Sequence, residues 1–567
     1  MFHYLSKKKF IFILYLLVVP MTAVTSVIFS KSLQPLLDVI YTKDQQEFII
    51  CSIVVVSAGI IDMAVGGLGR TIRERLRCEF VSGLRKNIFA HILGKSIPDY
   101  NEQDTSYYMN VLTHDTECMS RSYFDSVCGI YRVIVTFLIT MTALLTINPY
   151  IAVLNLIVGM ISVNLPRLFE KKLQKAQNTS SETSEEYVKK MKDYLSGFST
   201  IKLFHIQKQI SEKMETSNRQ QTKKSYQSFL TNYWVSWISI LCSVLSYVFT
   251  LVIGVWLVIK GDMTAGSVLA ISQMIGGIAA PFEELPAYIT ELKSIKDLKE
   301  KILTIAEQPA EEKIEECEKT EKCDIVLENV SYSYDGETNQ LDSINYHFKP
   351  EKKYVLVGES GSGKSTLAKS IMGFYPKAVG EIKINEKNIK DYSQAQLYHL
   401  MNYMQQNVFI FSDTLYHNIT LYQEYDEKQI EQVLKMSGLD EFVEKLPEGL
   451  HTTLSEDGGN ISGGERQRIG LARTLLTGAK YIIFDETTAS LDVLMENKIE
   501  NTILNLKDIG SIVITHRLNP NLLEKCDEIL VLKDGRLVES GSFAELIEKK
   551  KYFYSFYTVN HSIEENE

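Results

Sequence analysis

Apolar residues are distributed unevenly along the chain, and the long apolar runs are concentrated in its first half. A membrane hydrocarbon core of ~30 Å is crossed by roughly 20 mostly apolar helical residues. Six runs are candidates for such spans: about 10–30, 48–68, 127–146, 150–166, 234–259 and 265–288. The fourth run is the weakest candidate, because its apolar stretch extends only from Ile151 to Leu165 and ends at Pro166. A buried hairpin is an alternative there.

The loops between these runs alternate in charge, which predicts their side of the membrane. Lys and Arg collect on cytoplasmic loops. The loop from Asp38 to Glu47 carries three acids and only one base, Lys43. Basic clusters instead follow the second and fourth runs: Arg70, Arg73, Arg75, Arg77, Arg85 and Lys86, then Arg167, Lys171, Lys172 and Lys175. The pattern predicts six spans with both termini in the cytoplasm, and an odd number of spans would disturb it.

A basic patch, Lys7 to Lys9, precedes the first run and gives it the appearance of a signal peptide. However, the run is long, lacks a small-residue cleavage site and is followed by further apolar runs. We therefore expect a first membrane helix, with no targeting segment removed.

Two internal segments, about 69–126 and 167–233, are much longer than simple connectors and are predicted to be helical. The external loops have only a few residues. This asymmetry predicts helices that project into the cytoplasm toward the second half of the chain. Between the halves, the stretch from Glu307 to Lys322 is rich in Glu and Lys, which is typical of a solvated linker.

Overall composition, with 45% hydrophobic and 23% charged residues, resembles that of a soluble protein and hides this division. The formal net charge of −10 argues against a nucleic-acid partner, because such binders usually carry a basic excess. The eight cysteines form no CxxC pair and have no accompanying His cluster, so neither a zinc site nor a disulfide framework is expected.

From Asp324 onward, short β-branched runs alternate with turns and helical patterns, as in an α/β domain. The predicted strand Val355–Val357 leads into Gly358–Ser365, which reads GESGSGKS and matches the phosphate-loop pattern G-x-x-x-x-G-K-[ST]. The glycines allow consecutive backbone N–H groups to surround the β- and γ-phosphates. Lys364 adds a positive charge, and the Ser365 hydroxyl can ligate Mg²⁺. The helix that follows presents its positive N-terminal end to the anion.

A second chemical signal is the apolar stretch Tyr481–Phe484, which ends in Asp485 and Glu486. In P-loop ATPases an acid at such a strand end holds Mg²⁺, which assigns this role to Asp485. Glu486 is then placed to polarise the attacking water.

Beyond these two motifs, the segment Ile461–Arg468 (ISGGERQR) resembles the signature of ATP-binding cassette (ABC) proteins, which distinguishes them from other P-loop ATPases. Four further elements resemble the family's motifs and follow in the family's order: Tyr334 as the aromatic that stacks on adenine, Gln406 as the glutamine that senses Mg²⁺, Asp492 as the aspartate between the two cassettes, and His516 as the switch histidine. The resemblance implies a fold with an all-α six-helix transmembrane domain followed by an α/β P-loop ATP-binding cassette domain.

Less specific likenesses extend into the first half. The segment 196–204, which contains Gly197, resembles the second coupling-helix region of exporter-type half-transporters, and the segment 112–115, which ends at Asp115, resembles the first. The stretch 455–458 resembles the cassette loop that meets them. Coupling residues are accordingly expected at Asp492, Gly197 and Asp115.

Two departures from the family pattern occur. The signature begins with Ile461 where Leu is usual, and has Glu465 where Gln is usual. Because its Ser and Gly pair are retained, we expect hydrolysis to be retained as well. Met404 and Gln405 replace the usual Val-Pro before Gln406, with no expected consequence.

The motifs and the resemblance together imply ATP and Mg²⁺ as cofactors, with the following assignments. Catalysis falls to Glu486 and His516; Mg²⁺ ligation to Ser365, Gln406 and Asp485; and nucleotide binding to Tyr334, Gly358, Ser360, Gly361, Gly363, Lys364, Ser365, Thr366, Gln406, Ser462, Gly463 and Gly464. In the family, each ATP lies between the phosphate loop of one cassette and the signature of another. The chain therefore requires a second half-transporter, identical or paralogous.

Acidic side chains in the last apolar run are candidates for a substrate cavity. Glu283 and Glu284 follow Pro281 and Phe282 near the cytoplasmic end of that run, and Gln273 lies nearer its middle. Intramembrane acids are costly and usually face a cavity, where they could recognise a cationic substrate. The alternative, that they lie at the headgroup level, remains equally open.

The sequence thus predicts a transmembrane domain at 1–306, a linker at 307–323 and a nucleotide-binding domain at 324–567. The expected activity is ATP-driven transport across a bacterial cytoplasmic (inner) membrane, with export of a peptide, an amphipathic drug or a lipid as the leading interpretation. An importer built on the exporter fold, for a siderophore or metal chelate, is the alternative. A soluble cassette ATPase acting on DNA or ribosomes is disfavoured by the six spans. The substrate, the direction and the identity of the second half-transporter stay open.

Overall fold

The computed structural model describes residues 9–167, 169–307, 322–334, 336, 338–455, 458–487 and 493–564. The chain divides into two compact units. The first contains Met1–Gly94 and Asp104–Ala310, and the second contains Lys95–Gln103 and Glu311–Glu567.

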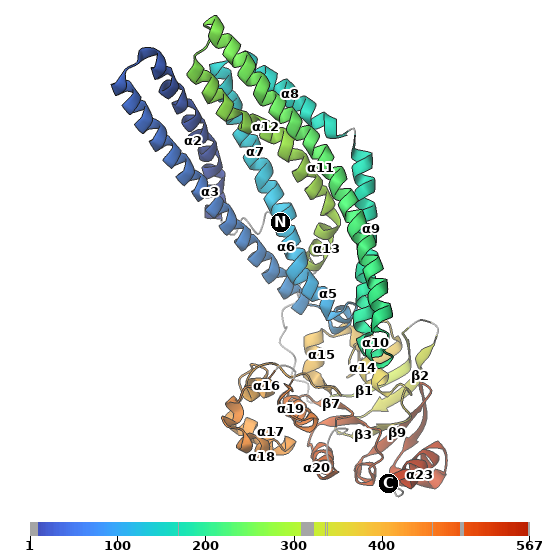
Figure 1. Cartoon of the computed structure of the whole chain (residues 1–567). Helices are drawn as coiled ribbons and strands as arrows, with labels where there is room; N and C mark the ends of the chain where they lie inside the picture. The colour runs from blue at the N-terminus through green and yellow to red at the C-terminus, as the bar shows by residue number, and fades with distance from the viewer. Residues whose placement is uncertain are drawn as a thin grey trace. The chain divides into compact units, whose positions relative to one another are not determined.

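Long helices build the first unit (Figure 1). They are α2 (Lys9–Thr42), α3 (Gln45–Leu93), α7 (Asp125–Ile147), α8 (Pro149–Arg167), α9 (Glu170–Ser196), α11 (Gln207–Lys260) and α12 (Ala265–Ser294). Shorter elements join or follow them: α5 (Thr105–Asn110), the π-helical η1 (Val111–Asp115), α6 (Thr116–Cys118), the π-helical η2 (Met119–Phe124), α10 (Phe198–Leu203) and α13 (Lys296–Glu307).

All six expected spans lie within helices, which confirms the helical prediction. Among the described residues, four helices are long and apolar enough to cross a membrane: Lys9–Thr42, Gln45–Leu93, Thr105–Ile147 and Ala265–Ser294. The fourth and fifth spans contain the shorter apolar stretches Pro149–Ile161 and Val244–Lys260. The most apolar window of α3 has no buried residue, which suits a helix whose apolar side chains face lipid.

Helix pairs account for the packing of this unit. Helix α2 packs against α3, α12 against α7 and α2, and α11 against both α8 and α9. The two internal segments are helical as predicted, since α3 continues to Leu93 and α9 runs beside the first half of α11 (Figure 1). The short helix α10 connects α9 to α11.

The second unit is an α/β domain with two sheets. A four-stranded antiparallel sheet has the order β2-β1-β4-β5, and a six-stranded sheet has the order β10-β9-β3-β8-β7-β6. The strands are β1 (Ile325–Ser333), β2 (Asn339–Phe348), β3 (Lys353–Val357), β4 (Val379–Ile384), β5 (Lys387–Asn388), β6 (Met401–Met404), β7 (Tyr481–Asp485), β8 (Gly510–Ile514), β9 (Glu528–Lys533) and β10 (Arg536–Gly541). In the larger sheet only the pair β9–β10 is antiparallel.

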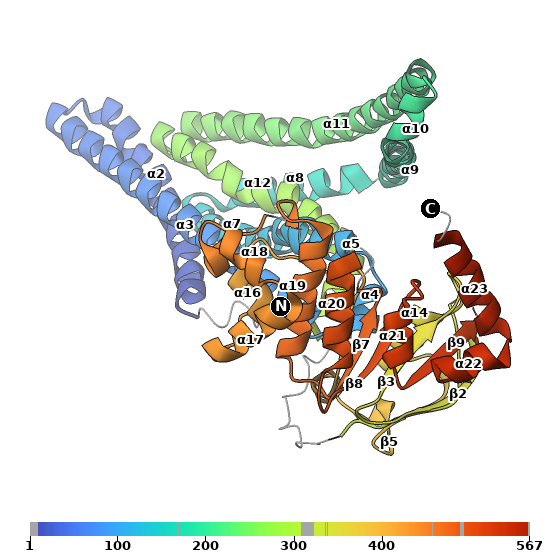
Figure 2. The ribbon, with the colours of Figure 1, turned by 90° about the horizontal axis from the view of Figure 1, so that it is seen from below.

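The helices of the second unit include several that pack on these sheets and a separate helical group. They are α4 (Ile97–Asn101), α14 (Lys364–Ile371), η3 (Ile389–Asp391), α15 (Gln394–Leu400), α16 (Leu415–Thr420), α17 (Glu427–Ser437), α18 (Asp440–Lys445), η4 (Gly449–His451), α19 (Gly463–Leu476), α20 (Val493–Leu504), α21 (Pro520–Lys525), α22 (Phe543–Lys549) and α23 (Tyr552–Glu564). Figure 2 shows α16, α17 and α18 gathered beside α19. A buried apolar cluster that includes Leu415, Val433 and Ile469 holds this group together.

The main core of the second unit lies where the two sheets and α14 meet. Its side chains include Ile325 and Ile384 from the smaller sheet and Leu356 and Ile483 from the larger one. All five residues are buried in each of β3, β7 and β8, and the apolar runs within them, 355–357, 481–484 and 512–514, are typical of central parallel strands.

Truncation of Ile384, which is fully buried in β4, is expected to lower the free energy of unfolding of the second unit by about 2–5 kcal/mol, because it leaves a cavity. Calorimetric unfolding of the full-length Ile384→Ala protein in detergent measures this. Val379→Ala on the same strand is the control, since Val379 is 69% exposed and should change the value by less than about 0.5 kcal/mol. Equal losses in the two variants would contradict the assigned core.

Candidate functional site

Four neighbouring strands of the larger sheet each deliver a predicted functional segment at the same edge. Strands β3, β8, β7 and β6 are adjacent and parallel. The phosphate loop follows β3, His516 follows β8, Glu486 follows β7 and Gln406 follows β6. Carboxyl ends of parallel strands are where α/β domains bind ligands, so the fold collects these residues at one site.

Positive backbone φ angles shape the phosphate loop. Gly363, at the N-cap of α14, has φ +101°, and a Cβ built there would lie 2.6 Å from the carbonyl oxygen of Gln340. Lys364 is buried, and its Nζ donates to the carbonyl oxygens of Gly358 at 2.8 Å and Glu359 at 2.9 Å. Burial lowers the pKa of Lys364. An anion is therefore the natural additional partner for this ammonium group.

Two further observations test whether the loop fits a phosphate with a bound cation. The Ser362 hydroxyl is buried and lacks a hydrogen-bond partner among the described residues, as expected for a donor aimed at a ligand. The Ser365 hydroxyl donates to Asp485 Oδ1 at 3.1 Å, so two oxygen ligands of the kind that Mg²⁺ prefers lie together. The predicted ligands Ser365 and Asp485 therefore fit the group.

The Glu486 side chain, at the end of β7, contacts side chains from the segments that follow β8 and β6. His516 Nε2 lies 2.7 Å from Glu486 Oε1, and the Gln406 side-chain amide donates to Glu486 Oε2. Glu486 itself has φ +51°, which is unusual for a residue with a side chain and is typical of functional positions. The structure thus brings the two predicted catalytic residues into contact, and the predicted Mg²⁺ sensor with them.

Tyr334 lies beside the phosphate-loop helix in a small aromatic group. Its hydroxyl is 2.8 Å from the Tyr375 hydroxyl and 3.4 Å from that of Thr366 on α14. The ring is 59% exposed, so its surface is available for a base to stack on. Ser360 and Gly361 are exposed at the crest of the loop.

The signature segment begins helix α19, and its unusual glutamate has a local role. Ser462 is the N-cap: its hydroxyl accepts from the Glu465 backbone N–H at 3.2 Å, and its own N–H donates to Glu465 Oε2 at 2.7 Å. This capping box explains why Glu is accepted where the family usually has Gln. Ser462 and Gly463 remain exposed.

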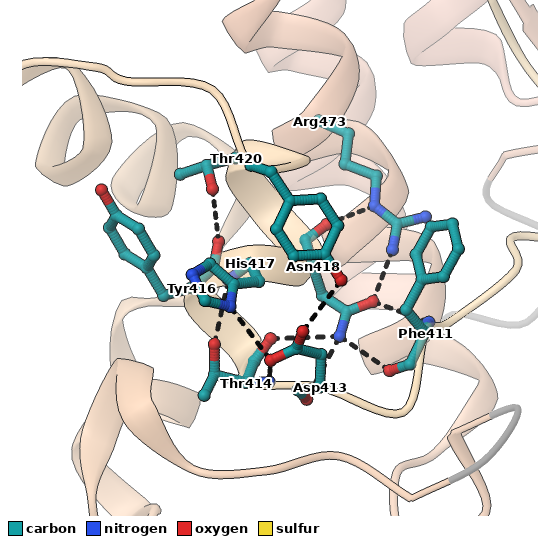
Figure 3. Close-up of polar contacts among 9 residues, drawn as sticks. Phe411, Asp413, Thr414, Tyr416, His417, Asn418, Thr420 and Arg473 are labelled. Atoms are coloured by element: carbon teal, nitrogen blue, oxygen red, sulfur yellow. Dashed lines mark hydrogen bonds and ion pairs between the residues drawn. The ribbon is translucent and has the colours of Figure 1, made fainter. Parts of the chain in front are cut away.

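The segment after Gln406 is attached to α19 by a half-buried arginine that the sequence analysis missed (Figure 3). Arg473 donates to the carbonyl oxygens of Asn418 and Phe409, and to Asn418 Oδ1 at 2.7 Å. The Asn418 amide in turn donates to the carbonyl oxygen of Phe411 at 2.9 Å. Burial lowers the pKa of Arg473 to about 10, so it remains charged at neutral pH. Hydrogen bonds therefore fix this segment to helix α19, which begins with the signature.

A second polar cluster that the sequence did not predict joins the residues that follow His516 to two acids of α20. Arg517 pairs with the buried Glu496 at 2.7 Å, and the Asn519 amide donates to Glu500 Oε2 at 2.6 Å. Glu500 is 1% exposed, and its other oxygen lacks a hydrogen-bond partner among the described residues. Burial, with the neighbouring charge of Glu496, raises the pKa of Glu500 to about 7.

Inside the first unit, the acids of α12 have different surroundings. Glu284 pairs with Arg132 of α7 and accepts from the Tyr288 hydroxyl at 2.9 Å. Glu283 is exposed and lines a small cavity of about 20 Å³ with Asn155 and Ser246. An arginine within the span 127–146 was the sequence signal that could have predicted the pair.

Gln273, the third cavity candidate, is exposed on α12. Of the expected coupling residues, Gly197 lies between α9 and α10, and Asp115 is buried in η1 with Lys301 Nζ at 2.6 Å. Asp492 lies outside the described residues, as do Glu456 and Asp457 of the cassette loop.

Comparisons with known proteins agree with this architecture. The family model described as the ABC transporter transmembrane region matches residues 12–282, and the one described as ABC transporter matches residues 341–489. The chain belongs to the ABC transporter family. With one transmembrane region fused to one cassette it is a half-transporter, and it couples ATP hydrolysis to transport across a membrane.

Individual relatives are similar over most of the chain. The ATP-dependent lipid A-core flippase of Yersinia pestis is 27% identical over 474 residues, which cover 82% of this chain and 81% of that protein. The multidrug resistance-like ATP-binding protein MdlB of Buchnera aphidicola is 26% identical over 492 residues, covering 85% and 83% respectively. A solved structure of a bacterial Atm1-family ABC exporter with ATP bound has the same fold, with a TM-score of 0.81, 19% identity and 97% of each chain covered.

Neutralising Glu500 is expected to stabilise the second unit in a pH-dependent way. Its pKa is about 7 in the folded chain and about 4.3 in the unfolded chain, so ionisation removes stability as pH rises from about 4.3 to about 7. The gain from Glu500→Gln should thus be larger at pH 8 than at pH 5 by about 2 kcal/mol, measured by denaturant unfolding of the full-length protein. The control is Glu431→Gln, an exposed site on α17. A gain independent of pH would refute the buried carboxylate as its cause.

Proposed function

We propose that the chain is an exporter that moves an amphipathic molecule, such as a lipid, a drug or a peptide, out across a bacterial cytoplasmic membrane. The ATPase activity in this proposal rests on the contacts of Gln406 and His516 with Glu486. Next to these residues is a phosphate loop whose Ser362 hydroxyl lacks a hydrogen-bond partner among the described residues. The basic clusters after the second and fourth spans support cytoplasmic termini.

In this proposal the nucleotide stacks on Tyr334, and Lys364 and the loop N–H groups hold its phosphates. Ser365 and Asp485, with Gln406, hold Mg²⁺, which when bound neutralises charge on the phosphate oxygens. Glu486 orients the attacking water, and His516 stabilises charge at the γ-phosphate. His516 and Gln406 both bond to Glu486, so a γ-phosphate and a metal would compete for these partners.

The proposed active form is a dimer, because the signature residues Ser462 and Gly463 are exposed and the family resemblance implies that they contact the nucleotide of another cassette. An identical partner is the simplest choice, since this chain carries both halves of the site. We further propose domain limits of 1–306 and 324–567, joined by a linker at 307–323.

Coupling between nucleotide and membrane is proposed to use two short segments. Helix α10, next to Gly197, buries none of its residues, and Phe198, Leu203 and the following Phe204 are 57%, 77% and 72% exposed. Such apolar side chains on a cytoplasmic connection suit contact with another protein surface. The first segment is proposed to be 112–115, which ends at Asp115; the Asp115 carboxylate lies 2.6 Å from Lys301 Nζ of α13.

For the cargo, the relatives named as a lipid A-core flippase and a multidrug resistance-like protein favour an amphipathic molecule. The membrane helices carry both apolar surface and polar groups, among them the Asn155–Thr250 hydrogen bond of 3.0 Å and the Arg132–Glu284 pair. Arg132 neutralises Glu284, so this acid is a weaker candidate for recognition of a cationic cargo. An importer with this fold remains the second candidate.

Hydrolysis by the chain alone is the first test. The purified chain in lipid should hydrolyse ATP, and Glu486→Gln should reduce the rate by at least about 100-fold while nucleotide still binds, because water is no longer polarised. Phosphate release measures the rate. An exposed exchange, Glu548→Gln on α22, is the matched control. If the folded chain is inactive by itself, the identical dimer is refuted and a paralogous partner is required.

Vesicle transport tests the direction. With cytoplasmic termini, inside-out vesicles expose the cassettes, so added ATP should drive a fluorescent amphipathic lipid or drug into their lumen in an exporter. The Glu486→Gln protein provides the background. Accumulation only in right-side-out vesicles loaded with ATP would instead establish import.

A further inference from the structure

The two carboxylate oxygens of Asp485 have different partners. Oδ1 accepts from the Ser365 hydroxyl at 3.1 Å, on the side of the phosphate loop. Oδ2 accepts from the Tyr403 hydroxyl at 2.5 Å. Asp485 is 5% exposed, so its carboxylate oxygens depend on these two donors in place of water.

Tyr403 reaches Asp485 from the neighbouring strand. It lies on β6, in register with Ile483 of β7, two residues before Asp485. The Tyr403 ring packs edge-on against Phe374, with 5.8 Å between ring centroids, and belongs to the margin of the main core. The hydroxyl is therefore presented from a strand and a packed ring rather than from a loop.

A donor in this position has a defined physical effect. Hydrogen bonds from O–H to a carboxylate are typically 2.5–2.7 Å long and about twice as strong as neutral ones. The terminal torsion of an aspartate is broad, so a carboxylate with one partner can rotate. A second donor on Oδ2 opposes this rotation and keeps Oδ1 directed at Ser365. Groups that orient metal ligands in this way typically contribute 10–100-fold to metal affinity.

We propose that Tyr403 is a positioning residue for the magnesium of the bound nucleotide: its hydroxyl fixes Asp485 so that Oδ1 and Ser365 face the metal together. The inference rests on the proposed roles of Asp485 and Ser365. None of the nucleotide motifs assigns a function to this tyrosine, which lies three residues before Gln406.

The test is Tyr403→Phe in the full-length chain in lipid nanodiscs, which keeps the ring and its packing. Binding of the non-hydrolysable analogue AMP-PNP is titrated with MgCl₂ and compared with binding in EDTA. The Mg²⁺ concentration at half-saturation should rise about tenfold, whereas binding in EDTA should be unchanged. Hydrolysis at saturating Mg²⁺ should return toward the parental rate.

Tyr392→Phe is the matched control, because it also removes a tyrosine hydroxyl bond, from Tyr392 to the Ile384 carbonyl oxygen at 2.8 Å, away from the site. It should leave the Mg²⁺ titration unchanged. In an Asp485→Asn background, Tyr403→Phe should add less than about a twofold effect, since both changes act on one carboxylate.

The outcomes separate the two proposals. If AMP-PNP binding by the parent chain does not depend on Mg²⁺, the proposed metal site is wrong. Two outcomes would refute the role of Tyr403 while leaving the metal site intact, provided that AMP-PNP binding by the parent chain depends on Mg²⁺. In the first, Tyr403→Phe needs the same Mg²⁺ concentration for half-saturation as the parent chain. In the second, Tyr403→Phe weakens AMP-PNP binding in EDTA as much as it weakens binding with Mg²⁺. A tenfold effect that persists in the Asp485→Asn background would also overturn it.

Discussion

Adjacent parallel strands must end at the same edge of a sheet, and the nucleotide chemistry of this half-transporter depends on that constraint. Strands β3, β8, β7 and β6 lie side by side in the sheet, although β3 is the first of the four in the sequence and β8 is the last. Their hydrogen-bonded register brings the phosphate loop, His516, Glu486 and Gln406 together without any one segment containing them all. Crossover helices allow the strands to be parallel, and their apolar packing keeps the edge rigid.

Local motifs were sufficient to predict most of this site. The phosphate loop, the paired acids at the end of β7 and the signature each have a physical reason to occur as a short unbroken segment, so the sequence displays them directly. Predicted strands at Val355–Val357, Tyr481–Phe484 and Ile512–Ile514 are confirmed, as are helices at all six expected spans. The weak fourth span is helical but contains one of the two shorter apolar stretches, in line with its composition.

What could not be predicted comes from contacts between distant positions. Tyr403, Arg473 and Glu500 are unremarkable in their own segments, and each acquires its role from a partner that only the fold supplies. A half-buried arginine needs carbonyl oxygens from another element, and the ionisation of a buried acid depends on which charges face it. For the same reason Glu465, which appears in the sequence as a departure, becomes in the structure a capping residue for α19.

The Arg132–Glu284 pair has a consequence for the way the chain is made. Synthesis separates the two residues by 152 positions, so α7 must enter the bilayer long before α12 exists. At about 5–20 residues per second, that interval is roughly 8–30 s. During this time the guanidinium has no carboxylate opposite it and must stay near lipid headgroups or the insertion machinery. Helix α12 therefore supplies the charge partner of α7 only when synthesis of the membrane helices is nearly complete.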